Sequence, residues 1–295
     1  MQIYLLVFLA GALQTTMGSV NGVLQGYIGQ FGVSLVTHVV GGGLLLGYLL
    51  FKRQRLKLWP MPWYLYSAGF LGLIQVAATS LCMQKIGPAL TTCLSIAGQL
   101  SQSILVDHFG WVGVRKTPFD KRRIPPLAVI VAGILVMNLG GAGAIGAGAA
   151  ENGGYVLLAF LVGGVGIYSE AVNFRASECL GTVNGTLVNY VVASGLSILL
   201  LTFTGGGEGW VRLGTAPFWA YLGGICGVVA MVIIVTSLKK IALFQAATLL
   251  LLGRLSCSTL LDGILFQNMS GIKLLGVAVV TVGVVWDKKL SLAEA

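Results

Sequence analysis

Two charged residues lie within long apolar stretches of this sequence. Arg254 follows the mostly apolar run 246–252, and Glu170 lies within the apolar stretch 163–174. A charge at the centre of a membrane-spanning helix costs about 2.5–3.5 kcal/mol even on lenient insertion scales, so each side chain needs a compensating role. Arg254 either binds an anionic group of a substrate or pairs with an internal carboxylate. Glu170 exchanges protons, as a proton-coupled carrier requires, contacts a cationic substrate, or serves as the counter-ion of Arg254.

Polar residues recur at helical spacing in two other segments. Each set has the spacing i, i+4, i+8, which puts three polar groups on one face of a helix. The two sets are Gln99, Ser103 and Asp107, and Arg254, Ser258 and Asp262. Inside a membrane such a face should point to a cavity or to another helix. The two aspartates lie near predicted helix ends, where we favour a capping or structural bond over contact with substrate.

Three further positions complete the candidate binding or coupling site. Gln14 and Asn21 are seven residues apart and therefore share a helix face. Asn21 recurs in the second half as Asn173, so a symmetric structural bond is the alternative to substrate binding. His38 and Tyr190 are secondary candidates, because a lone buried histidine is more often hydrogen-bonded and packed than a proton relay.

The composition explains why these charges stand out. Of the 295 residues, 56% are hydrophobic and only 9% are charged, whereas about a quarter of a soluble domain is charged. The chain could not cover its surface in water, so the lipid bilayer must be its main partner. The net charge of +9 lies in short clusters between apolar runs. That arrangement is an orientation signal and does not indicate binding of nucleic acid.

The sequence offers no pattern for catalysis or metal binding. Its five cysteines show no C-x-x-C spacing, which argues against a disulfide framework and a metal site. Neither a His/Asp/Glu cluster nor a Ser/His pair has catalytic spacing, so we expect neither an enzyme nor a cofactor. Arg175 and Glu178, three residues apart, are expected to pair on one helix face.

Apolar runs of about 20 residues, enough to cross a bilayer, predict an all-α integral membrane protein of ten helices. Basic clusters at 52–57 and 115–123 contrast with only Lys85, Arg212 and Lys273 on the opposite side, which places both termini in the cytoplasm of a bacterial inner membrane. The start of the chain reads as the first membrane helix and not as a removed signal. The predicted helices are 3–22, 33–51, 62–82, 88–108, 125–145, 154–173, 185–204, 217–237, 243–263 and 270–286.

The two halves of the sequence resemble each other. Residues 33–51 align with 185–203 at an offset of 152, and residues 98–107 align with 253–262 at an offset of 155. Gly29 falls on Gly181 at the first offset. We therefore expect two five-helix repeats, 1–147 and 148–295, joined by a flexible external link around 140–154. Five is an odd number, so the second repeat must be inverted in the membrane, and basic residues follow the cytoplasmic side.

Two motifs resemble the drug/metabolite transporter superfamily, in particular its YdcZ-type branch. The segment 98–110 is similar to the branch's helix-4 motif, and 11–14 with Asn21 beyond resembles its helix-1 pattern. The resemblance covers essentially the whole chain and implies two fused half-length units, with helices 1, 3, 4, 6, 8 and 9 around a central cavity. The second half departs from the helix-4 motif, because Arg254 replaces the glutamine and Gly263 replaces the histidine.

Inverted repeats with charges at membrane depth are typical of secondary transporters. We expect a small organic solute to move by alternating access, with protons as a candidate coupling ion. Arg254 near Glu170 would suit a zwitterion or an anion, and Glu170 alone would suit a cation. The alternatives are a passive channel or a membrane scaffold that does not transport. The sequence leaves the solute, the direction of transport and the choice between monomer and homodimer open.

Overall fold

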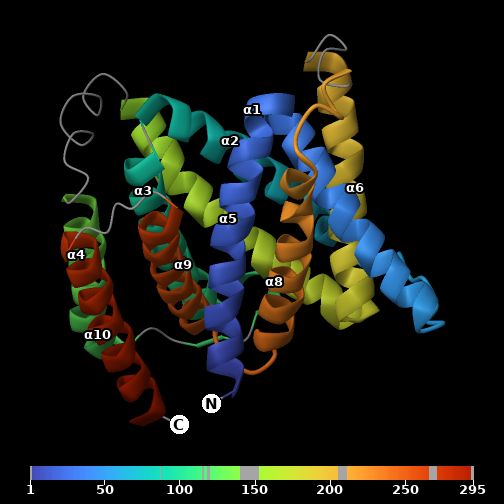
Figure 1. The fold of residues 1–295 in the computed structure, drawn as a ribbon. Helices are drawn as coiled ribbons and strands as arrows, with labels where there is room; N and C mark the ends of the chain where they lie inside the picture. Colours follow the sequence, from blue (N-terminus) through green and yellow to red (C-terminus); the bar gives the residue numbers. More distant parts are fainter. Residues whose placement is uncertain are drawn as a thin grey trace. The chain divides into compact units, whose positions relative to one another are not determined.

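The computed structural model describes residues 2–86, 88–114, 116–117, 120–139, 153–204, 211–265 and 271–293, and within these ranges it contains helices and no strand. Figure 1 shows the order of the elements along the chain. The long helices are α1 (Gln2–Phe51), α2 (Ser67–Ile86), α3 (Pro88–Phe109), α4 (Ile124–Leu139), α5 (Gly153–Leu180), α6 (Thr182–Thr204), α8 (Gly223–Ser237), α9 (Leu243–Leu265) and α10 (Gly271–Ala293). Short 3₁₀ helices are η1 (Trp63–Tyr66), η2 (Trp111–Gly113), η3 (Lys121–Arg123) and η4 (Phe218–Leu222).

The predicted helix limits agree with the observed ones where the apolar runs have sharp ends. Predicted helix 88–108 corresponds to α3, and predicted helix 243–263 corresponds to α9. The helix predicted at 154–173 corresponds to α5, which extends to Leu180. The more polar residues after 173 are also helical. Residues 140–145 of the predicted fifth helix, and most of the predicted link at 140–154, lie outside the described residues.

Two predicted helices begin differently from expectation, and for the same reason. The segments predicted to start at Pro62 and Pro217 open with the 3₁₀ helices η1 and η4 before α2 and α8 begin. Proline fixes its own φ angle and has no backbone N–H. Pro62 and Pro217 therefore each stand immediately before the first turn of a 3₁₀ helix.

Gly29 divides α1 into two helical segments. A straight helix of 50 residues would be about 75 Å long at about 1.5 Å per residue, more than twice the hydrocarbon thickness of a bilayer. Gly29 has non-helical backbone angles, with φ at 72° and ψ at 174°. Gly181, its counterpart at the offset of 152, has φ at 88° between α5 and α6. Glycine adopts positive φ without steric cost, so both halves turn at an equivalent glycine.

Several helices have the length and hydropathy of a membrane span. Among the described residues these are α1, α5, α6 and the segment Phe218–Ser237. Large apolar side chains lie exposed on them, including Leu5, Leu157 and Ile198. Such a surface suits lipid and not water, so the fold is that of a helical membrane protein. The count of ten spans stays a prediction.

The chain forms two compact units. Unit 1 comprises residues 1–12, 78–167 and 241–295, and unit 2 comprises residues 13–77 and 168–240. Each unit therefore combines segments from both halves of the sequence. The predicted boundary at 147 separates the two sequence repeats. Each compact unit, in contrast, is the set of segments that pack together.

In unit 1, glycines at equivalent sequence positions pack against equivalent backbone. A Cβ atom added to Gly98 or to Gly253 would overlap a phenylalanine carbonyl oxygen on the neighbouring helix. The matched contacts are Gly98 with Phe160, Gly253 with Phe8, Gly163 with Ser95, and Gly11 with Leu250. Each contact maps onto its counterpart through the offsets of 152 and 155 found in the sequence.

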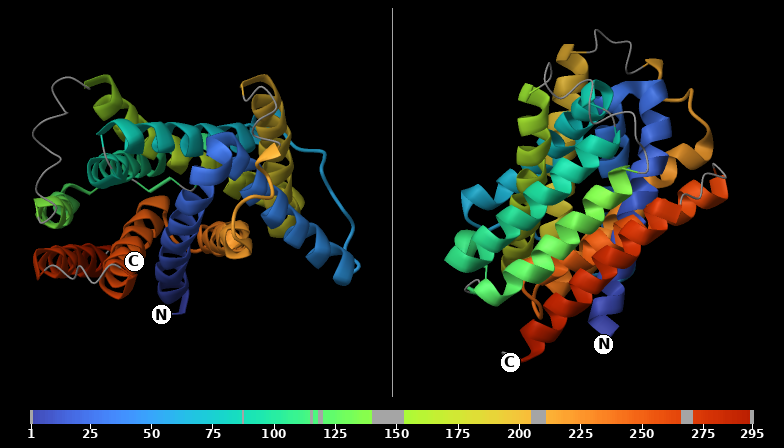
Figure 2. Two further views of the ribbon diagram at one scale, coloured as in Figure 1. Left: turned by 45° about the horizontal axis from the view of Figure 1, so that its top comes forward. Right: turned by 90° about the vertical axis from the view of Figure 1, so that its left-hand side faces the viewer.

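The helices α4 and α10 also pack in a matched way within unit 1. They lie side by side and run antiparallel (Figure 2). Gly133 on α4 meets Val280 and the carbonyl of Gly276, while Gly283 on α10 meets Ile130 and the carbonyl of Pro126. Adding 150 to a residue number in α4 gives the equivalent residue in α10, and the two sets of contacts then correspond.

Unit 2 repeats this pattern with a different pair of glycines. A Cβ atom on Gly69 would lie 2.6 Å from the carbonyl oxygen of Asn189, and one on Gly224 would lie 2.6 Å from that of Thr37. Thr37 and Asn189 are equivalent positions at the offset of 152. Gly69 and Gly224 are equivalent positions at the offset of 155. Equivalent helices thus approach one another closely in both units.

We expect Gly253→Ala to destabilise the protein, because the new methyl group would overlap the Phe8 carbonyl. Overpacking of this kind costs about 1–3 kcal/mol. Gly195→Ala is the matched control, since a Cβ atom there meets nothing within 4 Å and alanine favours the helix. Thermal unfolding in detergent should show a lower midpoint for the first variant only; equal midpoints would contradict the packing described.

Candidate functional site

Arg254 of α9 lies against α3 in unit 1. Its Nη1 donates a hydrogen bond to Oε1 of Gln99 at 2.7 Å, and both side chains are partly buried. Gln99 and Arg254 are equivalent positions at the offset of 155. A contact between two equivalent positions maps onto itself when the halves are exchanged. The bond therefore joins equivalent helices of the two halves of the sequence within this unit.

The partner of this bond is an uncharged amide. The Gln99 carbonyl fixes the direction of the guanidinium. A guanidinium carries five N–H donors in a planar fork that matches carboxylate and phosphate groups, and the bond to Gln99 uses one of them. The arrangement is chemically suited to holding an anionic group.

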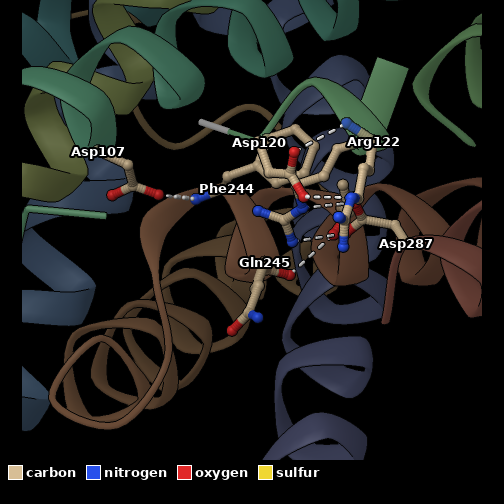
Figure 3. Close-up of polar contacts among 8 residues, drawn as sticks. Asp107, Asp120, Arg122, Phe244, Gln245 and Asp287 are labelled. Atoms are coloured by element: carbon tan, nitrogen blue, oxygen red, sulfur yellow. Dashed lines mark hydrogen bonds and ion pairs between the residues drawn. The ribbon is translucent and has the colours of Figure 1, made fainter. Parts of the chain in front are cut away.

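The remaining members of the α3 stripe also face α9 or stay within their own helix. Asp107 accepts hydrogen bonds from the backbone N–H groups of Leu243 at 3.2 Å and Phe244 at 2.7 Å (Figure 3). A carboxylate at this place satisfies the unpaired donors at the start of α9. Ser103 donates to the carbonyl of Leu100 at 2.8 Å.

These two contacts also give the direction of packing. Gln99 pairs with Arg254, whereas Asp107, farther along α3, reaches the beginning of α9. The helices α3 and α9 therefore run antiparallel. Because Asp107 holds the start of α9, it helps to set the position of Arg254 along α3. The side chains of Ser258 and Asp262 lie outside the described residues.

A buried ion pair near the start of α9 was not foreseen from the sequence. Nε of Arg123 donates to Oδ1 of Asp287 at 2.9 Å, and its Nη2 donates to Oδ2 at 3.0 Å. The guanidinium also lies 4.9 Å from the ring centroid of Phe244, the residue capped by Asp107 (Figure 3). In the sequence, Arg123 belongs to a basic cluster that indicates a loop. The only signal was an acidic residue, Asp287, beside two lysines.

The candidate residues of unit 2 form separate contacts. The rings of His38 and Tyr190, another pair of equivalent positions, meet edge to face with centroids 5.2 Å apart. Nδ1 of His38 lies 2.7 Å from the carbonyl oxygen of Ser34, so it donates to its own helix. Both residues are buried, which is the environment of a packed histidine.

Asparagine and acidic candidates also fall in unit 2. Thr37 Oγ1 donates to Asn21 Oδ1 at 3.3 Å, and Gln14 lies on the same helix, α1. Glu170 and Asn173 are buried on α5. Glu170 and Arg254 belong to different units, so an ion pair between them stays a prediction.

The predicted local pair on α5 is confirmed. Arg175 and Glu178 form an ion pair at the spacing i, i+3. Both side chains are partly exposed, so the pair contributes little to stability.

We expect Asp287→Ala to destabilise the protein strongly, because it leaves the buried guanidinium of Arg123 without its carboxylate. Breaking a buried pair on one side costs about 3–5 kcal/mol. The double variant R123M/D287L removes both charges and should recover most of the loss. Thermal or denaturant unfolding in detergent measures each change.

Arg122→Ala is the control for this pair. Arg122 is the neighbour of Arg123, and its contact with Asp120 involves a side chain that is 80% exposed. An exposed pair is worth at most about 1 kcal/mol. Equal losses in the Arg122 and Asp287 variants would show that the buried pair is not a main contributor.

Comparison with known proteins agrees with this architecture. The family model described as "Putative inner membrane exporter, YdcZ" matches the chain twice, over residues 2–136 and 154–286. A protein solved as "Crystal structure of protein" shares 16% of its residues with this chain, covers 98% of both chains and superposes with a TM-score of 0.75. At that identity the likeness shows the fold alone. No curated protein matches the sequence.

The two matches of one family model coincide with the two halves that the sequence offsets relate. A double match is what a fusion of two half-length units produces. The chain therefore belongs to the YdcZ branch of the drug/metabolite transporters, the family that this description names, and carries one family unit in each half.

Proposed function

We propose that this protein is a secondary transporter that moves a small organic solute with an anionic group across the inner membrane. The observation that carries the proposal is the Arg254–Gln99 bond. It holds a guanidinium within the apolar helix α9, against helix α3 of the other half of the sequence. A cation retained there at substantial energetic cost suits the recognition of a carboxylate or phosphate group.

The proposed mechanism is alternating access by two inverted five-helix repeats. In an inverted repeat, equivalent helices run in opposite directions. The pairs α3 with α9 and α4 with α10 are both equivalent and antiparallel, which supports the proposal. Two such halves can exchange conformations and so open one site to either side of the membrane. Ten spans with both termini in the cytoplasm complete this topology.

A channel or a scaffold is the competing proposal. A channel would pass solute down its gradient without saturation by a specific ligand, and a scaffold would pass none. Saturable flux that depends on Arg254 separates the transporter from both.

We expect Arg254→Gln to reduce solute flux at least about tenfold, because loss of a charged hydrogen bond costs about 1.5–3 kcal/mol and about 1.4 kcal/mol is a factor of ten. The variant gives both repeats the same residue at this position. Thermal-shift screening of carboxylate and phosphate metabolites first identifies a ligand of the wild type. Counterflow of that ligand in proteoliposomes then measures the flux.

Arg254→Lys keeps the charge and should retain part of the flux, while Arg122→Ala changes only an exposed arginine and should retain all of it. Gln99→Ala should raise the KM for the solute more than it lowers the maximal rate, because Gln99 orients Arg254. Wild-type flux in the Arg254→Gln protein would remove Arg254 from the site.

The topology predicts that the basic segments 52–57 and 121–123 share one face of the membrane. In a cysteine-free background, cysteines at Gln54 and Arg122 should react with a reagent confined to the cytoplasmic side. A cysteine at Arg212 should react only from the opposite side. Labelling of positions 54 and 122 from different sides would exclude the inverted arrangement.

A further inference from the structure

The hairpin of α5 and α6 in unit 2 brings polar residues of both helices into one turn. A Cβ atom on Gly185 would lie 2.6 Å from the backbone nitrogen of Ser177, so the helices touch immediately beside the Gly181 turn. Because the helices are antiparallel, one helical turn farther from the link places Asn173 opposite Asn189.

The contacts of helix α2 independently locate Asn173 and Asn189 beside each other. Ser169 Oγ donates to the carbonyl of Ala68 at 3.2 Å, and a Cβ atom on the next residue, Gly69, would lie 2.6 Å from the carbonyl oxygen of Asn189. One turn of α2 thus contacts α5 just before Asn173 and α6 at Asn189. The two asparagines lie around a common point.

Several polar atoms on these adjoining turns of α5 and α6 have no hydrogen-bond partner among the residues that the structure describes. They are both amide atoms of Asn173, Oγ1 of Thr186 and Oδ1 of Asn189. Asn173 and Thr186 are 0% exposed and Asn189 is 5% exposed. Each buried polar atom left without a partner costs about 1–3 kcal/mol, and such groups are rare unless a ligand, ion or water satisfies them.

The first half shows that the fold does not require this arrangement. Thr37 and Asn21 occupy the positions equivalent to Asn189 and Asn173, and there the hydroxyl donates to the amide oxygen at 3.3 Å. Ser34, equivalent to Thr186, lies with its Oγ 2.9 Å from that of Ser197. Within the described parts of the chain, the same positions are therefore satisfied internally in one repeat and not in the other.

The chemistry of the second-half set is that of a hard cation site. Three neutral oxygens, from two amides and one hydroxyl, are the kind of ligand that such cations take. Glu170 lies one turn before Asn173 on the same face of α5 and is buried. A single carboxylate balances a single positive charge, which keeps the site neutral at membrane depth. A water bound to the ion would accept from Nδ2 of Asn173.

We propose that the α5–α6 hairpin holds a Na⁺ site formed by Asn173, Thr186 and Asn189, with Glu170 supplying the negative charge. Binding of the ion does not require the transport mechanism proposed above. Use of its gradient to drive the solute does, and that part rests on the proposed function.

The test uses the purified full-length protein and the ion alone. Thermal unfolding is followed in NaCl, KCl and choline chloride at equal ionic strength. A ligand that binds only the folded state raises the midpoint in a saturable way. We expect a rise of about 4 °C or more at about 100 mM NaCl, with less in KCl and none in choline chloride.

Asn189→Thr is the decisive variant. It gives the second repeat the same residue pair as the first, so the introduced hydroxyl can donate to Asn173 and the protein should fold without the ion. We expect a midpoint at least as high as wild type in choline chloride, and no rise with NaCl. The matched variant Asn21→Ala, in the first repeat, should lower the midpoint in all three salts and keep the rise with NaCl.

Binding of radioactive sodium to the purified protein gives a second readout. Equal midpoints in NaCl and choline chloride, or a sodium response retained by Asn189→Thr, would overturn the proposal and leave the asparagines with water alone. The Arg254→Gln protein should still bind sodium. Loss of solute flux in that variant with sodium binding intact therefore separates the two proposals.

Discussion

The absence of water around most of this chain is the constraint on which its architecture depends. A charge or amide placed among apolar helices must find its partners within the protein. Arg123 finds a bidentate carboxylate in Asp287, and Asp107 finds the backbone donors at the start of α9. Arg254 receives a neutral oxygen from Gln99. The first two contacts fix elements in place, and the third orients a guanidinium.

Close helix packing provides the frame for those contacts. Lipid tails are as apolar as leucine, so helices in a membrane associate through van der Waals contact and not through burial from water. Glycines without side chains let backbones touch, and the touching glycines recur at equivalent positions, such as Gly98 and Gly253 in unit 1. The duplicated sequence thus preserves the packing contacts more faithfully than the polar residues, where Gln99 and Arg254 differ.

Much of the fold could be predicted from the sequence because its signals are local or periodic. The offset between Gly29 and Gly181 predicts matching turns, and the spacing of Gln99 and Asp107 predicts a shared face. Spacing alone does not show which helix stands opposite that face. The Arg123–Asp287 pair joins residues far apart in the chain, and both read as members of a charged loop. The Asn173 amide, which has no hydrogen-bond partner among the described residues, was equally hidden, because spacing does not show that Asn189 would lie opposite it.

The position of the Arg254–Gln99 bond has a consequence for the energetics of the proposed transport. In the inverted arrangement proposed above, a contact between equivalent residues stays on the pseudo-two-fold axis when the repeats exchange their conformations. Under alternating access the guanidinium would then meet the solute from either compartment in much the same surroundings. Such a site has little intrinsic preference for one side, so net movement would follow the solute and ion gradients and the residues that differ between the repeats away from the axis.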